Sequence, residues 1–240
     1  MRQEQGIHAK ELQLIHENFL CEFYFIRHGE SESNAIPGIV TGVDFDSPLS
    51  EKGVAQARLL GQRLRDEGVL LDRVYSSSLV RAVQTTEAML EAMGQPGRSF
   101  NRVDALIEQQ MPGWRGVRQE DVYTPQMVAY MRSKSAHFVP PEGESFRMVQ
   151  RRVSNWLDDE IIYNKDLVAK ERSLTVAIIG HGTATKSLFQ HIMGFDEGLI
   201  RRLSIYNCSI SRLLFNKEGW SVICVNDSSH LVRGGLGGTS

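Results

Sequence analysis

Two histidines directly follow apolar runs that have the composition of buried strands. His28 and Gly29 come after "CEFYFIR", and His181 and Gly182 come after "SLTVAIIG". Because open α/β sheets place their sites at the carboxyl ends of strands, we expect the two imidazoles to meet across one cleft. The glycine beside each histidine lets the backbone and a ligand approach closely. The pattern indicates one shared site at an edge of a sheet.

Two arginines are expected at the same edge. Arg27 precedes His28, and Arg81 lies one turn into the helix expected after "VYSSS". Arginine is always charged, and its guanidinium group forks onto phosphate oxygens. Together with the two histidines, these side chains predict a compact cationic pocket that suits a dianionic phosphate.

Strands that alternate with helices must position this pocket. Strands are expected at 21–26, 71–77 and 173–180, with a short one near 103–106. Helices are expected at 51–68 after Ser50, at 79–94 after Ser78, at 144–163 and at 183–194. Residues 108–144 contain four prolines and are expected to be irregular, with one short helix near Met127. Two late strands around Lys217–Gly219 are predicted to form a hairpin.

This order of elements predicts an α/β fold. The expected architecture is a three-layer α/β/α sandwich with a mostly parallel central sheet and an antiparallel edge. Residues 1–20 are interpreted as an N-terminal extension, 21–232 as one domain and the glycine-rich 233–240 as a flexible tail.

Composition narrows the classes of partner and compartment. The 240 residues carry a net charge of −2, which gives no basic face for nucleic acid. The start lacks a signal-peptide core, and no apolar run is long enough to span a membrane. Cys21, Cys208 and Cys224 are interpreted as buried thiols of a reducing compartment, so a cytoplasmic location is predicted. A homodimer is a possible assembly.

With these motifs, the chain resembles the histidine phosphatase superfamily, which has the phosphoglycerate mutase-like fold. The resemblance covers about residues 21–232 and keeps the order of the family's blocks. Those blocks stand here as Arg27-His28-Gly29-Glu30, Pro48 to Ala57, Ser76 to Thr85, Leu106 to Glu108 with Gly113 to Gly116, Gly143 to Ser145, and His181-Gly182.

The resemblance implies a role for each catalytic position. His28 is the nucleophile that carries the phosphoryl group, and its second ring nitrogen is expected to be held by a hydrogen bond. Glu108 is the acid and then the base. Arg27, Arg81 and His181 hold the phosphoryl oxygens. The family positions that line the substrate pocket are Asn34, Thr41, Gly42, Gly182 and Thr183.

Other acidic residues and histidines have weaker claims. Glu120 and Asp121 lie in the same irregular segment as Glu108, and Glu144 fits the first turn of a helix better than a catalyst. The remaining histidines have no spacing that suggests zinc, so neither a metal nor a cofactor is expected. These remaining histidines are His8, His16, His137, His191 and His230.

The resemblance leaves three functions open. Mutases of this kind carry a long basic insertion after the catalytic glutamate, and Gln109–Pro141 is too short for it, so a phosphatase acting on a small phosphorylated metabolite is favoured. The alternatives are phosphoglycerate mutase-type transfer and a non-catalytic phospho-ligand or protein-binding module.

One departure concerns the pocket mouth. The family often has an acidic residue between the tryptophan and the glycine of its tryptophan-containing block, where this chain has Arg115, with Arg118 close behind. This is interpreted either as a surface substitution or as a second anion contact, to which Arg132, Lys134 and Arg147 could contribute.

Overall fold

A six-stranded sheet forms the centre of the chain, whose computed structural model describes residues 16–40, 46–169 and 173–237. The strand order is β3-β2-β4-β1-β5-β6. The strands are β1 (Leu20–Arg27), β2 (Arg73–Ser77), β3 (Asn101–Val103), β4 (Ser173–Gly180), β5 (Ile210–Asn216) and β6 (Gly219–Asp227).

Pairing divides the sheet into a parallel part and an antiparallel edge. β1, β4, β2 and β3 are parallel, whereas β5 pairs antiparallel with β1 and with β6. β1 and β4 are in register, so Arg27 lies opposite Gly180 and both strands end at the same edge. The predicted mixed sheet and its late hairpin are therefore confirmed.

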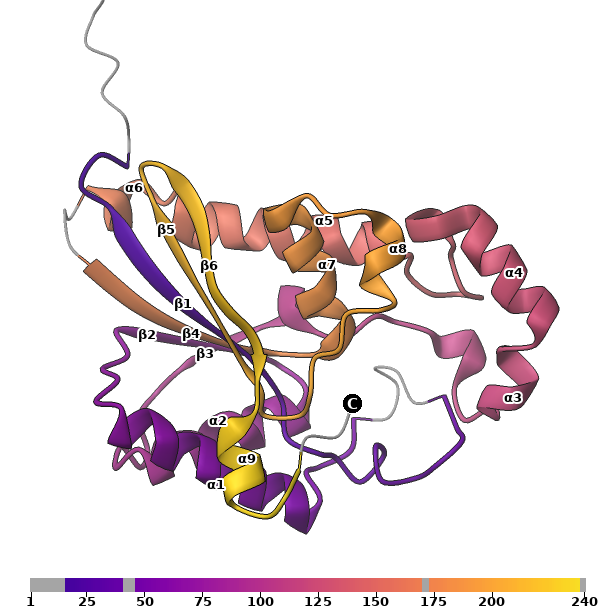
Figure 1. Ribbon diagram of the computed structural model, residues 1–240, viewed down its shortest axis with the longest axis horizontal. Helices are drawn as coiled ribbons and strands as arrows, with labels where there is room; N and C mark the ends of the chain where they lie inside the picture. Colours follow the sequence, from indigo (N-terminus) through magenta and orange to yellow (C-terminus); the bar gives the residue numbers. More distant parts are fainter. Residues whose placement is uncertain (1–15, 41–45, 170–172, 238–240) are drawn as a thin grey trace, which may run out of the picture.

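Helices cover both faces of this sheet (Figure 1). In the view of Figure 1, α1, α2 and α9 lie below it and α5, α7 and α8 above it. The helices are α1 (Glu51–Asp66), α2 (Val80–Ala92), α3 (Gln119–Val122), α4 (Pro125–Lys134), α5 (Phe146–Leu157), α6 (Lys165–Val168), α7 (Gly182–Met193), α8 (Glu197–Ile200) and α9 (Ser229–Arg233). Short turns complete them: η1 (Asp104–Leu106), η2 (Pro112–Trp114), η3 (Ser135–His137) and the π-helical η4 (Asp158–Ile162).

The alternation of side chains along β1 feeds two cores. Phe23 and Phe25 pack with α5 and α7, while Tyr24 and Ile26 pack with α1 and α2. Successive side chains of a strand point to opposite faces, so a strand that is apolar throughout must be covered on both sides. This explains why "CEFYFI" lacks polar alternation and why the fold has three layers.

Two helix boundaries differ from the expected ones. Ser50 caps α1 by accepting the Gly53 N–H, as expected, but Ser78 does not cap α2. Its hydroxyl donates to Asp104 instead, and α2 begins after Leu79 without a side-chain cap. The helix expected over 144–163 begins only at Phe146, after its cap Ser145, and changes to the π-helical turn at 158.

A separate small core organises the irregular segment. Five buried side chains from it and from the loop after β1 pack together: Val40, Trp114, Val122, Met131 and Phe138. Backbone hydrogen bonds join residues 38–40 to 116–119. The segment expected to hold one short helix thus holds α3 and α4 and covers the carboxyl edge of the sheet.

Some expectations fall at the margins of the described chain. Residues 1–15 of the expected extension and 238–240 of the expected tail lie outside the described residues. Cys21 and Cys208 are buried as expected, but Cys224 is partly exposed. Within the described ranges, no helix combines the length and the apolar character that crossing a membrane requires.

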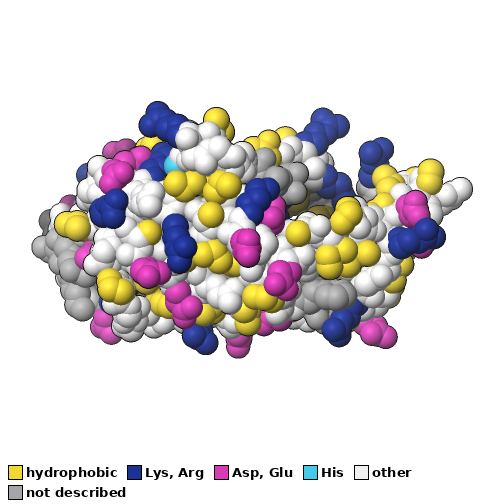
Figure 2. All heavy atoms as spheres, turned by 90° about the horizontal axis from the view of Figure 1, so that it is seen from below, with side chains coloured by type: hydrophobic (Ala, Val, Ile, Leu, Met, Phe, Trp, Pro, Cys, Tyr) yellow, Lys and Arg dark blue, Asp and Glu magenta, His cyan; other side chains and the backbone are white. Residues whose placement is uncertain are grey.

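Charge is mixed rather than segregated on one face of the molecule. Figure 2 shows Lys and Arg side chains interspersed with Asp and Glu over the face seen from below. Salt at about 0.1 M screens exposed charges that are more than about 10 Å apart. The local field at any site on this face is therefore set by the residues nearest to it.

We predict that Gly53→Ala destabilises the protein. A Cβ at this position would lie 1.9 Å from the Glu30 carbonyl oxygen, in the loop that follows His28. Alanine normally stabilises a helix by about 0.5–1 kcal/mol relative to glycine, but the clash should reverse the sign and cost about 1–3 kcal/mol. Denaturant unfolding measures the difference. Gly182→Ala, whose Cβ meets only contacts of 3.7 Å or more, serves as control and should not lose stability.

Candidate active site

The backbone holds His28 rigidly at the end of β1. Its N–H donates to the Gly180 carbonyl of β4 (3.0 Å), and its carbonyl accepts from the Asn207 amide (2.9 Å). The Gly29 N–H donates to the Thr85 hydroxyl (3.0 Å). Because the imidazole is only 3% exposed, its position is set by these contacts rather than by solvent.

Hydrogen bonds fix which ring nitrogen of His28 carries the proton. Nδ1 lies 2.6 Å from the Gly29 carbonyl oxygen, which can only accept. The Nε–H of Arg81 points at Nε2 from 3.3 Å. Both contacts are satisfied when Nδ1 is protonated and Nε2 keeps its lone pair. The expected hydrogen bond to the second nitrogen is present, and Nε2 is left as a nucleophile.

His181 is completely buried and stands against His28. The two ring centroids are 4.9 Å apart, and His181 Nε2 is 2.8 Å from the Ser77 hydroxyl at the end of β2. His181 Nδ1 is buried without a hydrogen-bond partner among the described residues. The His181 ring therefore lies beside that of His28, and one of its nitrogens is not used by any described residue.

Burial and positive charge keep both imidazoles neutral. The pKa of His28 and that of His181 lie well below the usual value, first because the rings are buried and next because of Arg81. Arg27 adds to the effect at both. Burial also lowers the pKa of Arg27 and Arg81, while Glu108 opposes this lowering at both. Since arginine stays protonated, the histidines give up their protons instead.

Glu108 lies at the N-terminus of α7. Its carboxylate accepts the N–H groups of Gln109, Thr183 and Ala184 at 2.8–3.2 Å. The unpaired N–H groups and the dipole at a helix N-terminus favour an anion there. A Cβ on Gly182 would lie 3.7 Å from both Glu108 Oε2 and Arg27 Nε, so the acid and the arginine meet at this glycine.

An ion pair anchors the segment that carries Glu108. Arg152 of α5 contacts both carboxylate oxygens of Glu144 at 3.0 Å and donates to the carbonyls of Ala105, Ile107 and Glu108. Glu144 precedes the cap of α5 instead of lying in its first turn. It therefore acts through Arg152 to position the segment that carries Glu108.

These side chains surround a cavity of about 230 Å³. Six predicted site residues line it: Arg27, His28, Asn34, Arg81, Glu108 and Thr183. His181 and Gly182, which were also predicted, are not among its lining residues. Thr41 and Gly42 lie outside the described residues. The sequence reasoning did not identify six other lining residues, which are Ser33, Ile39, Val40, Met111, Gln119 and Tyr123.

The two arginines expected near the mouth do not line this cavity. Arg118 forms ion pairs with Glu120 and Asp121, and it is exposed. Arg115 is exposed on the covering segment. Gln119 and Tyr123 occupy the cavity wall instead, so the covering segment presents an amide and a phenol to the site.

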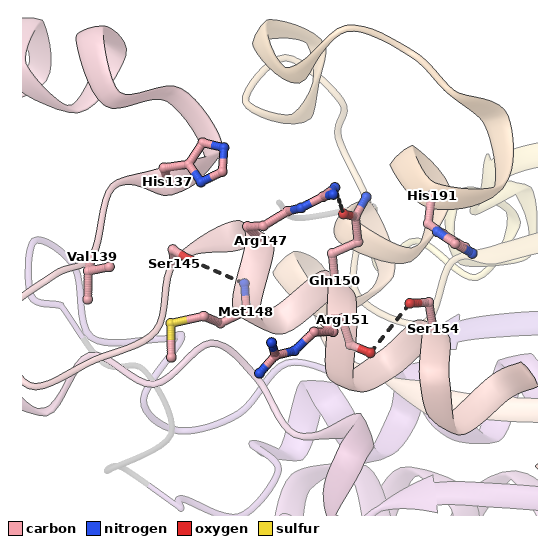
Figure 3. Close-up of a pocket in the computed structure, with 9 residues that line it drawn as sticks. All are labelled: His137, Val139, Ser145, Arg147, Met148, Gln150, Arg151, Ser154 and His191. Carbon is pink, nitrogen blue, oxygen red and sulfur yellow. Dashed lines mark hydrogen bonds between the residues drawn. The ribbon is translucent and has the colours of Figure 1, made fainter. Parts of the chain in front are cut away.

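A larger groove lies between α5, α7 and η3 (Figure 3). It measures about 610 Å³ and includes His137, Arg147, Arg151 and His191. The Arg147 guanidinium group donates a hydrogen bond to the Gln150 side-chain oxygen (2.6 Å). In Figure 3 the basic side chains point in different directions. The groove thus lacks the convergent nucleophile, acid and cations of the smaller cavity. Among the described residues, no three His, Cys, Asp or Glu side chains cluster as metal ligands.

We predict that stability falls as the pH drops below about 6.5, the usual histidine pKa. In this pH range the two histidines bind protons in the unfolded chain, whereas His28 and His181 stay neutral in the folded chain. Each histidine should therefore lower the free energy of unfolding by up to about 1.4 kcal/mol per pH unit. His230, whose pKa burial lowers to about 4, adds to the loss. Denaturant unfolding between pH 7.5 and 4.5 measures the slope, which His28→Gln should reduce by about one proton. Equal slopes in both proteins would contradict the burial argument.

Comparison with known proteins assigns this arrangement to a family. The family model described as "Histidine phosphatase superfamily (branch 1)" matches residues 23–228. A protein named "Probable phosphoglycerate mutase GpmB" from Yersinia pestis (strain Pestoides F) is 30% identical over 220 residues, which span 88% of this chain and 95% of the relative.

Solved structures share the fold. The phosphoglycerate mutase from Bacillus anthracis str. Sterne superposes with a TM-score of 0.74 at 22% identity, covering 91% of this chain and 98% of that one. The phosphoserine phosphatase of Entamoeba histolytica, in complex with 3-phosphoglyceric acid, gives a TM-score of 0.73 at 20% identity, covering 88% and 99%. The family match over residues 23–228, with the α/β fold described above, shows that this chain belongs to the histidine phosphatase superfamily.

Proposed function

We propose that residues 21–232 form a phosphomonoesterase that hydrolyses a small phosphorylated metabolite through a phosphohistidine intermediate. One observation carries the proposal: His28 presents an unprotonated Nε2 to a cavity lined by Arg27, Arg81 and Glu108. A dianionic phosphoryl group fits this charge, and its phosphorus is the electrophile that an imidazole attacks.

The chemistry proceeds in two balanced steps. In the first, Glu108 has taken up a proton from solvent as the dianionic substrate binds. The Nε2 lone pair of His28 bonds to phosphorus, the bond to the leaving oxygen breaks, and Glu108 gives that oxygen its proton. In the second, Glu108 takes a proton from water, the water oxygen bonds to phosphorus, and the N–P bond breaks. Inorganic phosphate leaves and His28 is neutral again. Arg27, Arg81 and His181 hold the phosphoryl oxygens throughout.

The covering segment favours water as the acceptor. Gln109–Pro141 is too short for the long basic insertion associated with mutase activity. A second candidate is phosphoglycerate mutase-type transfer, which the relationship to the probable mutase from Yersinia pestis favours. Incubation with 3-phosphoglycerate separates the two: a phosphatase releases inorganic phosphate, whereas a mutase yields an isomer with no net release.

His28→Ala should reduce turnover of 4-nitrophenyl phosphate on the order of 10⁴-fold or more, because no other side chain can replace the attacking nitrogen. Rapid quenching of the wild-type protein should trap a phosphoryl adduct on His28 that is labile in acid and stable in base. His137→Ala, at an exposed histidine of η3, is the matched control and should keep wild-type turnover. Near-normal turnover of His28→Ala, with its fold intact, would disprove the assignment of the nucleophile.

Glu108→Gln should slow phosphorylation of the enzyme by an alkyl phosphate far more than by 4-nitrophenyl phosphate. An alkoxide needs a proton in the transition state, and general acid catalysis contributes about 100-fold to 10,000-fold, or roughly 3 to 5 kcal/mol. A nitrophenolate needs little help. Burst kinetics isolate this first step, because the later attack by water also uses Glu108. Equal slowing with both substrates would leave Glu108 a role only in binding or structure.

A further inference from the structure

Three arginines line a second cavity, which lies between the end of α4 and α8. It measures about 450 Å³, and its lining residues are Arg132, Ser135, Gly198, Arg201 and Arg202. Figure 1 shows α8 beside the end of α4, and η3 contacts α8. None of these residues lines the catalytic cavity, so the two cavities are distinct.

The three arginines of this cavity have no carboxylate partner among the side chains that the structure describes. Arg132, Arg201 and Arg202 are exposed, and no described side chain forms an ion pair or a hydrogen bond with their guanidinium groups. Other arginines of the chain form ion pairs with carboxylates, as Arg152 does with Glu144. Guanidinium groups around one cavity repel each other, and an anion between them removes that repulsion.

The carboxylate of Asp196, which precedes α8, accepts a backbone hydrogen bond rather than pairing with an arginine. Asp196 accepts the Gly198 N–H at 2.8 Å and so caps this helix. Lys134, at the end of α4, stands over the Tyr130 ring at 5.5 Å. The basic residues around the cavity therefore divide into the three arginines that line it and a lysine that stacks on a neighbouring ring.

Arg201 is held in place by a contact that leaves its donors available. Its Cζ lies 5.2 Å from the centre of the Phe146 ring, a cation–π geometry that uses the face of the guanidinium group. The pKa of Arg201 is lowered first by burial and also by the charge of Arg132, which shows that the two side chains are near each other. The N–H groups at the edge of the guanidinium remain to bind a ligand.

Tyr123 relates this cavity to the catalytic one. It lines the wall of the catalytic cavity, and the positive charge of Arg201 acts on its phenol. Arg201 and the catalytic cavity are therefore both close to Tyr123.

We propose that Arg132, Arg201 and Arg202 form a second anion-binding site, which takes a phosphate or carboxylate group. The group belongs either to the far end of the substrate, an assignment that rests on the function proposed above, or to a separate small anion. Three fork-shaped donors and the hydroxyl of Ser135 suit an oxyanion with several acceptor atoms.

The first experiment tests whether the substrate carries the second anion. The kcat/KM values of alkanediol bisphosphates are compared with those of alkyl monophosphates of the same length, over a series of chain lengths. If the arginines bind the far phosphate, the kcat/KM of the bisphosphate should exceed that of the monophosphate over one range of chain lengths. The double variant Arg201→Gln, Arg202→Gln should then lose about tenfold or more of that preference while 4-nitrophenyl phosphate turnover stays unchanged.

The second experiment tests for a separate anion. Inorganic phosphate is titrated calorimetrically into the wild-type protein and into the double variant, whose catalytic cavities are identical, so a difference between them reports on the arginine cavity. The wild-type protein should bind a second phosphate, and the double variant should bind it about tenfold or more weakly. Because this arm compares variants of the arginine cavity directly, it gives a result even if the protein hydrolyses none of the phosphate esters.

The matched control is Arg58→Gln, Arg65→Gln, which removes the same charge from α1 on the opposite face of the sheet. It should behave as wild type in both arms. If the double variant unfolds at a lower temperature than wild type, Arg202→Gln alone replaces it. An effect in either arm that the control lacks supports the site and identifies the source of the anion. Equal behaviour of variant and control in both arms overturns the proposal, whether or not the catalytic proposal holds.

Discussion

The burial of two guanidinium groups beside two imidazoles is the constraint on which the site depends. Arginine does not escape burial by losing its proton, so Arg27 and Arg81 impose their charge on everything near them. His28 and His181 respond by staying neutral. Among the described residues that line the cavity, Glu108 is the one carboxylate, and the start of α7 binds both of its oxygens. The resting site is therefore short of negative charge, which the phosphoryl dianion of the proposed substrate would supply.

The fold serves this constraint by bringing strand ends together. The register of β1 with β4 puts Arg27 opposite Gly180, so the residues that follow both strands start from one edge. The approach of Gly29 to Gly53 then lets the loop after His28 turn tightly against α1. Thr85 joins this loop to α2 by accepting from Gly29 and donating to the Arg81 carbonyl. The same threonine therefore connects the strand that carries His28 to the helix that carries Arg81.

The sequence predicts well that these residues meet at one edge of the sheet, because they follow strands directly. His28 and His181 come one residue after an apolar run, and Arg81 lies in the first turn of a helix, so local patterns place all three. Gln119 and Tyr123 have no such pattern, since residues 116–119 reach the site only by pairing with residues 38–40 far away in the chain. Ser78 has the composition of a cap, but the Asp104 carboxylate, which is distant in sequence, takes its hydroxyl. Thr41 and Gly42 stay predictions.

The division between the sheet edge and the covering segment separates two kinds of specificity. Under the proposed function, the residues at the strand ends recognise the phosphoryl group, which all phosphate monoesters share. The covering segment would then contact the group attached to it, and the side chains of that segment are positioned by the small core around Trp114. Changes in that core can therefore alter the position of Gln119 and Tyr123 while the nucleophile and its arginines stay in place. Because α4 carries both a residue of this core and Arg132, the same packing also sets the distance between the catalytic cavity and the arginine cavity.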